Sequence, residues 1–447
     1  MYTTIEEIKK ASNKYSQIRE KIRRAIITIN PVELVTPLGA TAEEMDWLDT
    51  LEKSNYRVFE NPNLDNYDPA LINHCISQEK TLLQLQSELS SVKENATGIA
   101  ESFVLENYMQ AITDSLKTAK LAKSIENKND KESASIVKEK YGCPSFDNVT
   151  DAINIAHQIL NGSFDVSAAK KANISFKPKT LRWFNAIKPI YTQDFMSMIK
   201  SAFDLYQTHA SPIYQIPDYV YGTVEALDKT FFKTAPSVIV PLVANMDDFS
   251  FVRLLKREID CRWRCSRNVE ELGLLKCDDE FVYDGFSAFT DMDYSEKYLG
   301  QKAIDGIYYM VAIDNASCSD DGQGSFTNTA KLIYNLLPET MDKKTRARNT
   351  WKYTYSAYRG ITDTNNKSGY AFTKDRNIYE GYIYVKSLFL HESTEYLNYG
   401  ALPKTIFEKF MSIVDKKDAE RNAILSQDIE PFLFNEIEKA IPVVHPI

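Results

Sequence analysis

Charged residues crowd one segment of the chain, from Met246 to Arg267, which reads MDDFSFVRLLKREIDCRWRCSR. Arg257, Glu258 and Arg262 lie close together within it. A glutamate in such a setting can act as a general acid or base, and paired arginines present forked donors to a carboxylate or a phosphate. Because a guanidinium stays protonated and has no lone pair to give, neither arginine can bind a metal. These residue types therefore indicate chemistry on an anion.

A helix is expected to carry these side chains. Its apolar residues recur at helical spacing and would share one face: Val252, Leu255, Ile259 and Trp263. Asp247 and Asp248 can cap its start, and the arginines near its end suit the helix dipole. Glu258 and Arg262 stand at i and i+4, so an ion pair on a solvated helix surface is the alternative to a buried charge cluster.

The stretch from Leu254 to Arg264, LLKREIDCRWR, resembles the L-x-x-H-E-I-G-T-H-x-L-R helix of a family of helical zinc metallopeptidases. That family includes microtubule-associated tyrosine carboxypeptidase and the bacterial QEGLA-motif proteins. Its fold resembles the glutamate-zincins, in which a metal-binding helix, a second helix that gives a glutamate ligand and a small sheet lie together. The resemblance implies a core of this kind here.

Further motifs of the family occur in the family's order, and together they carry the resemblance over roughly residues 30 to 410. The family motifs are P-x-N, N-P-x-F-x-Y, Y-G-x-P, E-G-L-A, G-S-F, R-V-x-R-G and F-T-K-D-x-x-Y-x-x-G. The matching residues are Asn30-Pro31, Phe59-Glu60-Asn61-Pro62, Tyr141-Gly142-Cys143-Pro144, Asp284-Gly285-Phe286-Ser287-Ala288, Gly324-Ser325-Phe326, Tyr358-Arg359-Gly360, and Phe372-Thr373-Lys374-Asp375 with Tyr379-Glu380-Gly381.

The residues that bind zinc in the family are replaced in this chain. The resemblance implies two histidines and the E-G-L-A glutamate as ligands, with the glutamate after the first histidine as general base. The corresponding positions hold Arg257, Arg262 and Asp284, and only Glu258 is kept. None of the five histidines lies at a motif position. We therefore expect no zinc or other cofactor and no hydrolysis by the family mechanism.

The vacated metal site is expected to hold charge instead. We expect Arg257 and Arg262 to converge with Glu258 and Asp284 into a buried cluster of ion pairs. An arginine pair in such a site can bind a carboxylate or a phosphate, and a peptide carboxy terminus is one natural ligand.

Three residues of the carboxy-terminal motifs are further binding candidates. In the family, basic residues hold the terminal carboxylate of the substrate, and the resemblance transfers this role to Arg359 and Lys374. Tyr379 belongs to the same F-T-K-D-x-x-Y motif as Lys374. The alternative is that these two cations only form ion pairs with Asp375 or Glu380.

A cysteine-based metal site is the remaining candidate. Cys261, Cys265 and Cys277 have the spacing C-x3-C-x11-C, which matches no zinc pattern. Buried apolar cysteines are the expected alternative. No histidine lies near them in sequence to activate a thiol as a nucleophile.

Composition narrows the class of protein. The formal charge of -9 argues against a general nucleic-acid partner, since phosphate binding requires a surplus of Lys and Arg. No apolar stretch approaches the roughly 20 residues that span a bilayer, and the start MYTTIEEIKKASNKY has no apolar signal core. Six cysteines without close pairing indicate reduced thiols. We expect a soluble cytoplasmic protein that binds neither nucleic acid nor membrane.

Helical periodicity dominates the chain, with amphipathic helices predicted over 69–93, 100–123 and 148–160. β-Branched and aromatic runs punctuated by prolines appear between Ser211 and Val243, where a small sheet is expected. The predicted class is therefore α+β and predominantly helical, with a glutamate-zincin-like core. We divide the chain into a helical region over 1–205 and a peptidase-like core over 206–447, packed as one unit.

Three functions are compatible with these features. The first is a peptidase homologue without zinc that binds a peptide tail or another small anionic ligand. The second is an enzyme of altered chemistry, in which Glu258 is the acid or base and Arg257 and Arg262 stabilise negative charge on a substrate. The third is a non-catalytic regulatory partner of another protein.

Overall fold

The computed structural model describes residues 2–27, 29, 31–163, 218–222, 237–241, 264–276, 280–290, 301–318 and 323–423. Long helices precede residue 163: α1 (Ile5–Lys14), α2 (Ser16–Ala25), α3 (Pro31–Leu34), α4 (Ala40–Lys53), α5 (Pro69–Lys93), α6 (Ile99–Glu126), α7 (Asp130–Tyr141) and α8 (Phe146–Leu160). Two strands follow, β1 (Asp218–Gly222) and β2 (Ser237–Pro241). The later elements are α12 (Arg264–Glu271), α13 (Phe281–Thr290), α14 (Gln301–Ala316), α15 (Phe326–Leu336), α16 (Lys343–Ala357), η3 (Thr373–Asp375), α17 (Arg376–Leu390), η4 (Thr394–Tyr399), α18 (Lys404–Ile413) and α19 (Lys416–Asn422).

Local capping explains where several helices begin. The side chain of Thr4 accepts a hydrogen bond from Glu7 N while the Glu7 carboxylate accepts one from Thr4 N, which is a complete capping box for α1. Asp68 caps α5 through Ala70 N, and proline occupies the first helical position. Ser145 caps α8 in the same way through Asn148 N. These caps satisfy amide groups that a helix start leaves without partners.

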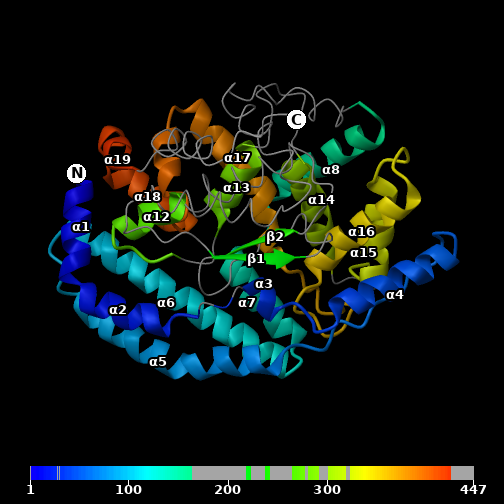
Figure 1. Cartoon of the computed structure of the whole chain (residues 1–447), viewed down its shortest axis with the longest axis horizontal. Coiled ribbons are helices and arrows are strands. Elements are labelled where there is room, and N and C mark those ends of the chain that lie inside the picture. The colour runs from blue at the N-terminus through cyan, green and yellow to red at the C-terminus, as the bar shows by residue number, and fades with distance from the viewer. Residues whose placement is uncertain are drawn as a thin grey trace, which may run out of the picture.

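Two groups of helices build the core. On one side α6 packs against α1, α2, α5, α7 and α18, and Phe103, Leu105, Tyr108 and Ile112 of α6 are fully buried. On the other side α14 packs against α8, α13, α15, α16 and α17 (Figure 1). Apolar side chains of both groups belong to one continuous buried cluster.

The amino-terminal end of the chain is attached to its late helices. Thr3 N donates to Ile413 O at 2.7 Å, and Ile5 N donates to the Asp418 carboxylate at 2.7 Å. Figure 1 shows α1 beside α19 at the same edge of the molecule. The second bond joins residues 413 positions apart in the sequence. The first helix is therefore held against the late helices of the chain.

The predicted α+β class is wrong. β1 and β2 pair in parallel, with Tyr219 opposite Val238 and Tyr221 opposite Val240, and this two-stranded pair makes no sheet layer. Elsewhere in the described ranges, strand pairing is limited to one isolated bridge between Thr3 and Val414. The apolar faces of the described helices are buried against each other, so the fold is predominantly helical.

Candidate functional site

The predicted site residues divide into two sets. Arg257, Glu258 and Arg262, like Cys261 and Cys277, lie outside the residues that the structure describes. Asp284, Arg359, Lys374 and Tyr379 are described, and they lie on or beside α13 and α17. The site is therefore described from these two helices.

Helices α13 and α17 run in the same direction and pack unusually closely. At one end the Lys374 ammonium pairs with the Glu280 carboxylate at 3.1 Å, and at the other end the rings of Phe289 and Phe389 lie 4.2 Å apart. Between them Gly285 meets Gly381: a Cβ on Gly285 would lie 2.1 Å from the carbonyl oxygen of Gly381. Only glycine permits this approach. The structure thus brings the Asp284-Gly285 motif directly onto the Tyr379-Glu380-Gly381 motif.

Lys374 is a buried cation at the start of α17. Its side chain is 7% exposed and Glu280, just before α13, is its partner. Neither Asp375 nor Glu380, the alternative partners expected from the sequence, takes this role. Burial strengthens the attraction between Lys374 and any negative group because little water screens it.

Arg359 pairs with Asp375, which is one of the alternatives expected from the sequence. The guanidinium Nη1 lies 3.3 Å from the Asp375 carboxylate, and the guanidinium carbon lies 5.4 Å from the ring centroid of Tyr355. Ser356 also donates to Asp375 through its hydroxyl. The buried Nε of Arg359 has no acceptor among the described residues, so part of its donor capacity is unused.

Tyr379 and Glu380 attach α17 to α8. The Tyr379 hydroxyl donates to Asp151 at 2.5 Å, and burial, followed by this carboxylate, raises the pKa of Tyr379 well above its usual range. Glu380 accepts hydrogen bonds from Ser145 N at 2.7 Å and from Asn148 Nδ2 at 3.1 Å. Through these contacts both residues position α17 against α8. The ligand-binding role predicted for Tyr379 is not needed to explain its contact with Asp151.

The Tyr141-Gly142 motif meets the same end of α17. Arg376 pairs with Glu380 and donates through Nε to Tyr141 O at 2.7 Å. Gly142 has φ +79°, and a Cβ there would lie 2.6 Å from Arg376 Nη2. A larger residue would therefore be strained and would displace the guanidinium.

Two polar groups near this end were missed by the sequence reasoning. Asp305 of α14 is 8% exposed, and it accepts from Lys352 Nζ at 2.8 Å and from the Tyr353 hydroxyl at 2.6 Å. Asn377, in the first turn of α17, is fully buried, and neither its Nδ2 nor its Oδ1 has a partner in the part of the chain described. The only sequence signal for Asn377 was its position inside the F-T-K-D-x-x-Y match.

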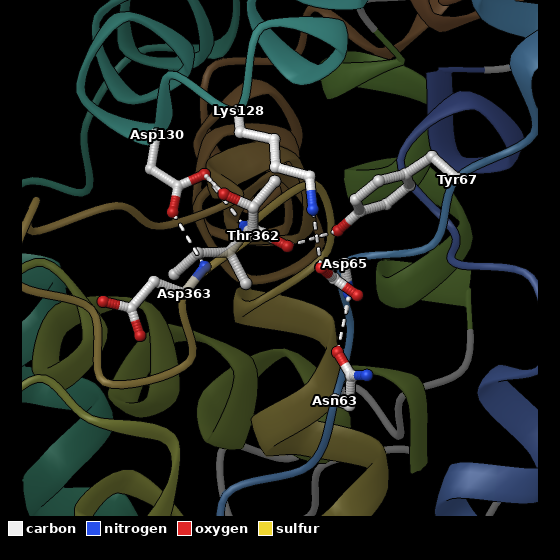
Figure 2. Close-up of polar contacts among 8 residues, drawn as sticks. Asn63, Asp65, Tyr67, Lys128, Asp130, Thr362 and Asp363 are labelled. Atoms are coloured by element: carbon white, nitrogen blue, oxygen red, sulfur yellow. Dashed lines mark hydrogen bonds and ion pairs between the residues drawn. The ribbon is translucent and has the colours of Figure 1, made fainter.

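A second polar cluster joins three distant segments (Figure 2). Asp130, the first residue of α7, accepts hydrogen bonds from Thr362 N, the Thr362 hydroxyl and Asp363 N at 2.8, 2.9 and 2.9 Å. Beside it, Lys128 pairs with Asp65 at 2.7 Å and the Tyr67 hydroxyl donates to Ile361 O at 2.5 Å. The cluster fixes the loop after Gly360 through hydrogen bonds within the protein.

The Asn61-Pro62 motif contacts the residue that follows the Gly324-Ser325-Phe326 motif. Asn61 Oδ1 accepts from Thr327 N at 3.0 Å and from the Thr327 hydroxyl at 2.7 Å. Phe59 and Phe326 both pack against Trp47. These contacts connect the early and late parts of the chain.

The described residues do not form a set of ligands that fits a zinc ion. Two of the three positions that the resemblance assigns to zinc ligands hold arginine, and the third, Asp284, lies on a helix whose neighbouring acid, Glu280, is paired with Lys374. Within the described ranges no group of three His, Cys, Asp or Glu side chains converges. Cys265 is buried and its thiol donates to Leu397 O at 3.2 Å, as a core cysteine does.

Comparisons with known proteins give no match: no protein-family model, curated protein or solved structure is similar to the chain. The described helices include none that is long and apolar enough to cross a bilayer.

Proposed function

We propose that this protein is a divergent relative of the tyrosine carboxypeptidase-type family that has lost zinc and binds the carboxylate end of a peptide, or a similar anion, beside the start of α17. The observation that carries the proposal is the pair of buried cations there. Lys374 is almost fully buried, and the Nε donor of Arg359 has no acceptor among the described residues. A carboxylate is the natural acceptor for both.

The retained motifs support a common ancestry with the family. Motifs that begin at Asp284 and Phe372 in the sequence lie against each other on α13 and α17, through a contact that only glycine allows. Residues at the family's zinc positions have changed to arginine, which adds positive charge in place of the metal. Binding without hydrolysis is the function that both features favour.

A reducing compartment such as the cytoplasm is part of the proposal. Cys75 and Cys265 are fully buried, Cys143 and Cys318 are exposed, and none of these four described cysteines forms a disulfide. Free cysteines of both kinds are typical of proteins that function where thiols stay reduced.

The test uses peptides of the form acetyl-Ala-Ala-Ala-Xaa, with every common residue in turn at the last position. Each is measured by isothermal titration calorimetry as the free acid and as the carboxamide. We expect at least one free acid to bind, its carboxamide to bind at least about tenfold weaker, and Lys374→Met to remove this difference, because roughly 1.4 kcal/mol corresponds to tenfold.

Two controls make the result specific. Lys409→Met removes a half-buried lysine that pairs with Glu106 between α18 and α6, and it should leave peptide affinity unchanged. The double variant Lys374→Met with Glu280→Gln restores charge balance without restoring the cation, so it should still fail to distinguish acid from amide. Equal affinity for acid and amide in the wild type would refute the carboxylate site. One equivalent of tightly bound zinc in purified protein would refute the loss of the metal.

A further inference from the structure

Asn377 is a buried side chain with unused hydrogen-bonding capacity. An asparagine amide offers two N–H donors and an acceptor oxygen, and neither atom of Asn377 has a partner among the described residues although the residue is fully buried. The hydroxyl of Thr373, one turn earlier, is equally buried and also lacks a partner there. Leaving such groups unsatisfied costs free energy, so an occupant that satisfies them is favoured.

Other buried asparagines show that this fold satisfies such groups. Asn107 donates to Leu275 O at 2.9 Å and accepts from Leu275 N at 2.7 Å. Asn366 donates to Ala316 O, Gly324 O and Tyr370 O and accepts from Tyr370 N. Both use their amides to bind peptide backbone. Asn377 has the same chemistry but binds no backbone group among the described residues.

The position of Asn377 relates it to the proposed carboxylate site. Asn377 is the second residue of α17, and one residue separates it from η3, which contains Thr373 and Lys374. Because side chains of a helix point back toward its amino terminus, we expect the amide of Asn377 to lie on the η3 side. Asp375, which precedes α17, makes no side-chain cap, because its carboxylate is bound by Ser356 and Arg359. The start of this 15-residue helix therefore has its partial positive charge uncapped beside the orphaned amide.

We infer that Asn377 binds the backbone of an extended peptide at the residue before its carboxy terminus, with Nδ2 donating to that residue's C=O and Oδ1 accepting its N–H. In an extended chain the N–H and C=O of one residue point to the same side, as they do toward a neighbouring strand. The side-chain carboxamide of Asn377 has one donor group and one acceptor atom, so it can bind that N–H and C=O as a neighbouring strand does. The inference depends on the proposed function, since Lys374 would hold the terminal carboxylate, and it identifies the ligand as a peptide and excludes a free phosphate or a small acid.

The first experiment needs no ligand. Asn377→Leu replaces the amide with an apolar group of similar size, and we expect the thermal midpoint to rise because two unsatisfied buried groups are removed. Asn107→Leu is the matched control, and its midpoint should fall because it leaves Leu275 N and Leu275 O without partners. A fall for Asn377→Leu, or failure of that variant to fold, would show that the amide is engaged within the protein and would overturn the inference.

The second experiment uses the free-acid peptide that binds wild-type protein best, and the same peptide with an N-methyl group on the penultimate alanine. We expect the methyl group to weaken binding to wild-type protein at least about tenfold, the equivalent of roughly 1.4 kcal/mol, and to have no effect on Asn377→Leu. An equal loss in both proteins would overturn the role of Asn377 while the carboxylate site stands. Failure of every free-acid peptide to bind wild-type protein would instead overturn the proposed function, and this inference with it.

Discussion

Single polar side chains hold the loops of this protein in place. The hydroxyl of Tyr67 donates to Ile361 O, and that of Tyr108 donates to Gly273 O at 2.8 Å. Asn366, with φ +53°, closes the loop from Asp363 to Tyr370 through backbone contacts. Each of these groups is buried and paired, and each joins backbone segments that lie far apart or turn sharply.

Asp130 provides a stability prediction at this scale. Asp130→Ala removes the acceptor of two backbone N–H groups and one hydroxyl, so we expect it to lower the free energy of unfolding by about 1–3 kcal/mol. Asp65→Ala breaks only the partly exposed pair with Lys128 and should cost about 0–1 kcal/mol. Urea denaturation at neutral pH measures both. Equal effects of the two variants would contradict the role assigned to Asp130.

The pH dependence of stability tests the same residue. Burial raises the pKa of Asp130, although hydrogen bonds from Thr362 and Asp363 oppose the shift. A raised folded-state pKa means that the contribution of this group is fully present below the unfolded pKa of about 3.9 and is lost as pH rises through the folded pKa. The free energy of unfolding of the wild type, relative to that of Asp130→Asn, should therefore fall as pH rises from about 3. A difference in urea midpoint between the two proteins that stays constant over this pH range would contradict the prediction.

Two glycines allow α13 and α17 to pack closely. The contact between α13 and α17 depends on Gly285 and Gly381, since a Cβ on Gly381 would lie 2.3 Å from Phe281 O. Ion pairing of Lys374 with Glu280 at one end and ring stacking of Phe289 on Phe389 at the other fix the register of the two helices. The spacing of the site residues follows from this packing.

Gly381→Ser is the corresponding prediction at the scale of the element. It places a side chain against the backbone of α13, so we expect a loss of about 1–3 kcal/mol or more in the free energy of unfolding. Gly98→Ser adds the same atoms at the start of α6, where nothing lies within 4 Å and serine suits the capping position. Differential scanning calorimetry of the two variants should show a lowered midpoint only for Gly381→Ser. Similar midpoints would mean that the helices separate at little cost.

At the scale of the whole molecule, we expect the described helices to unfold as one cooperative unit. α8 packs on α14 and α15, Trp47 of α4 packs on Phe326 and Trp351, and α1 packs on α19. Apolar side chains from α1 to α19 share one core. Separating early from late helices would expose much of this shared apolar surface, which is unfavourable.

Cysteine labelling tests this cooperativity. Cys75 of α5 and Cys265 of α12 are fully buried, whereas Cys143 and Cys318 are exposed and serve as native-state controls. We expect Cys75 and Cys265 to become reactive at the same urea concentration when labelled peptides are quantified by mass spectrometry. Separate transitions for the two thiols would show that the early and late helices unfold independently.

Sequence alone determined the features that depend on near neighbours. Helices predicted over 69–93 and 100–123 are present as α5 and α6, because apolar spacing and caps act within a few turns. That Arg257 and Arg262 replace the zinc ligands of a related family stays a prediction from the sequence, because both residues lie outside the described ranges. The α+β class was wrong because a β-branched run alone does not set how many strands pair.

Tertiary structure decided which partner each charged or polar group has. Lys374 pairs with Glu280, 94 positions away, and not with either acid in its own motif. Tyr379 reaches Asp151 across 228 positions, and Asn377 is buried without a described partner. Such pairings depend on how whole helices pack, and no spacing within one helix encodes them. The chemistry available at the start of α17 therefore became visible only when α13, α8 and α14 were placed around it.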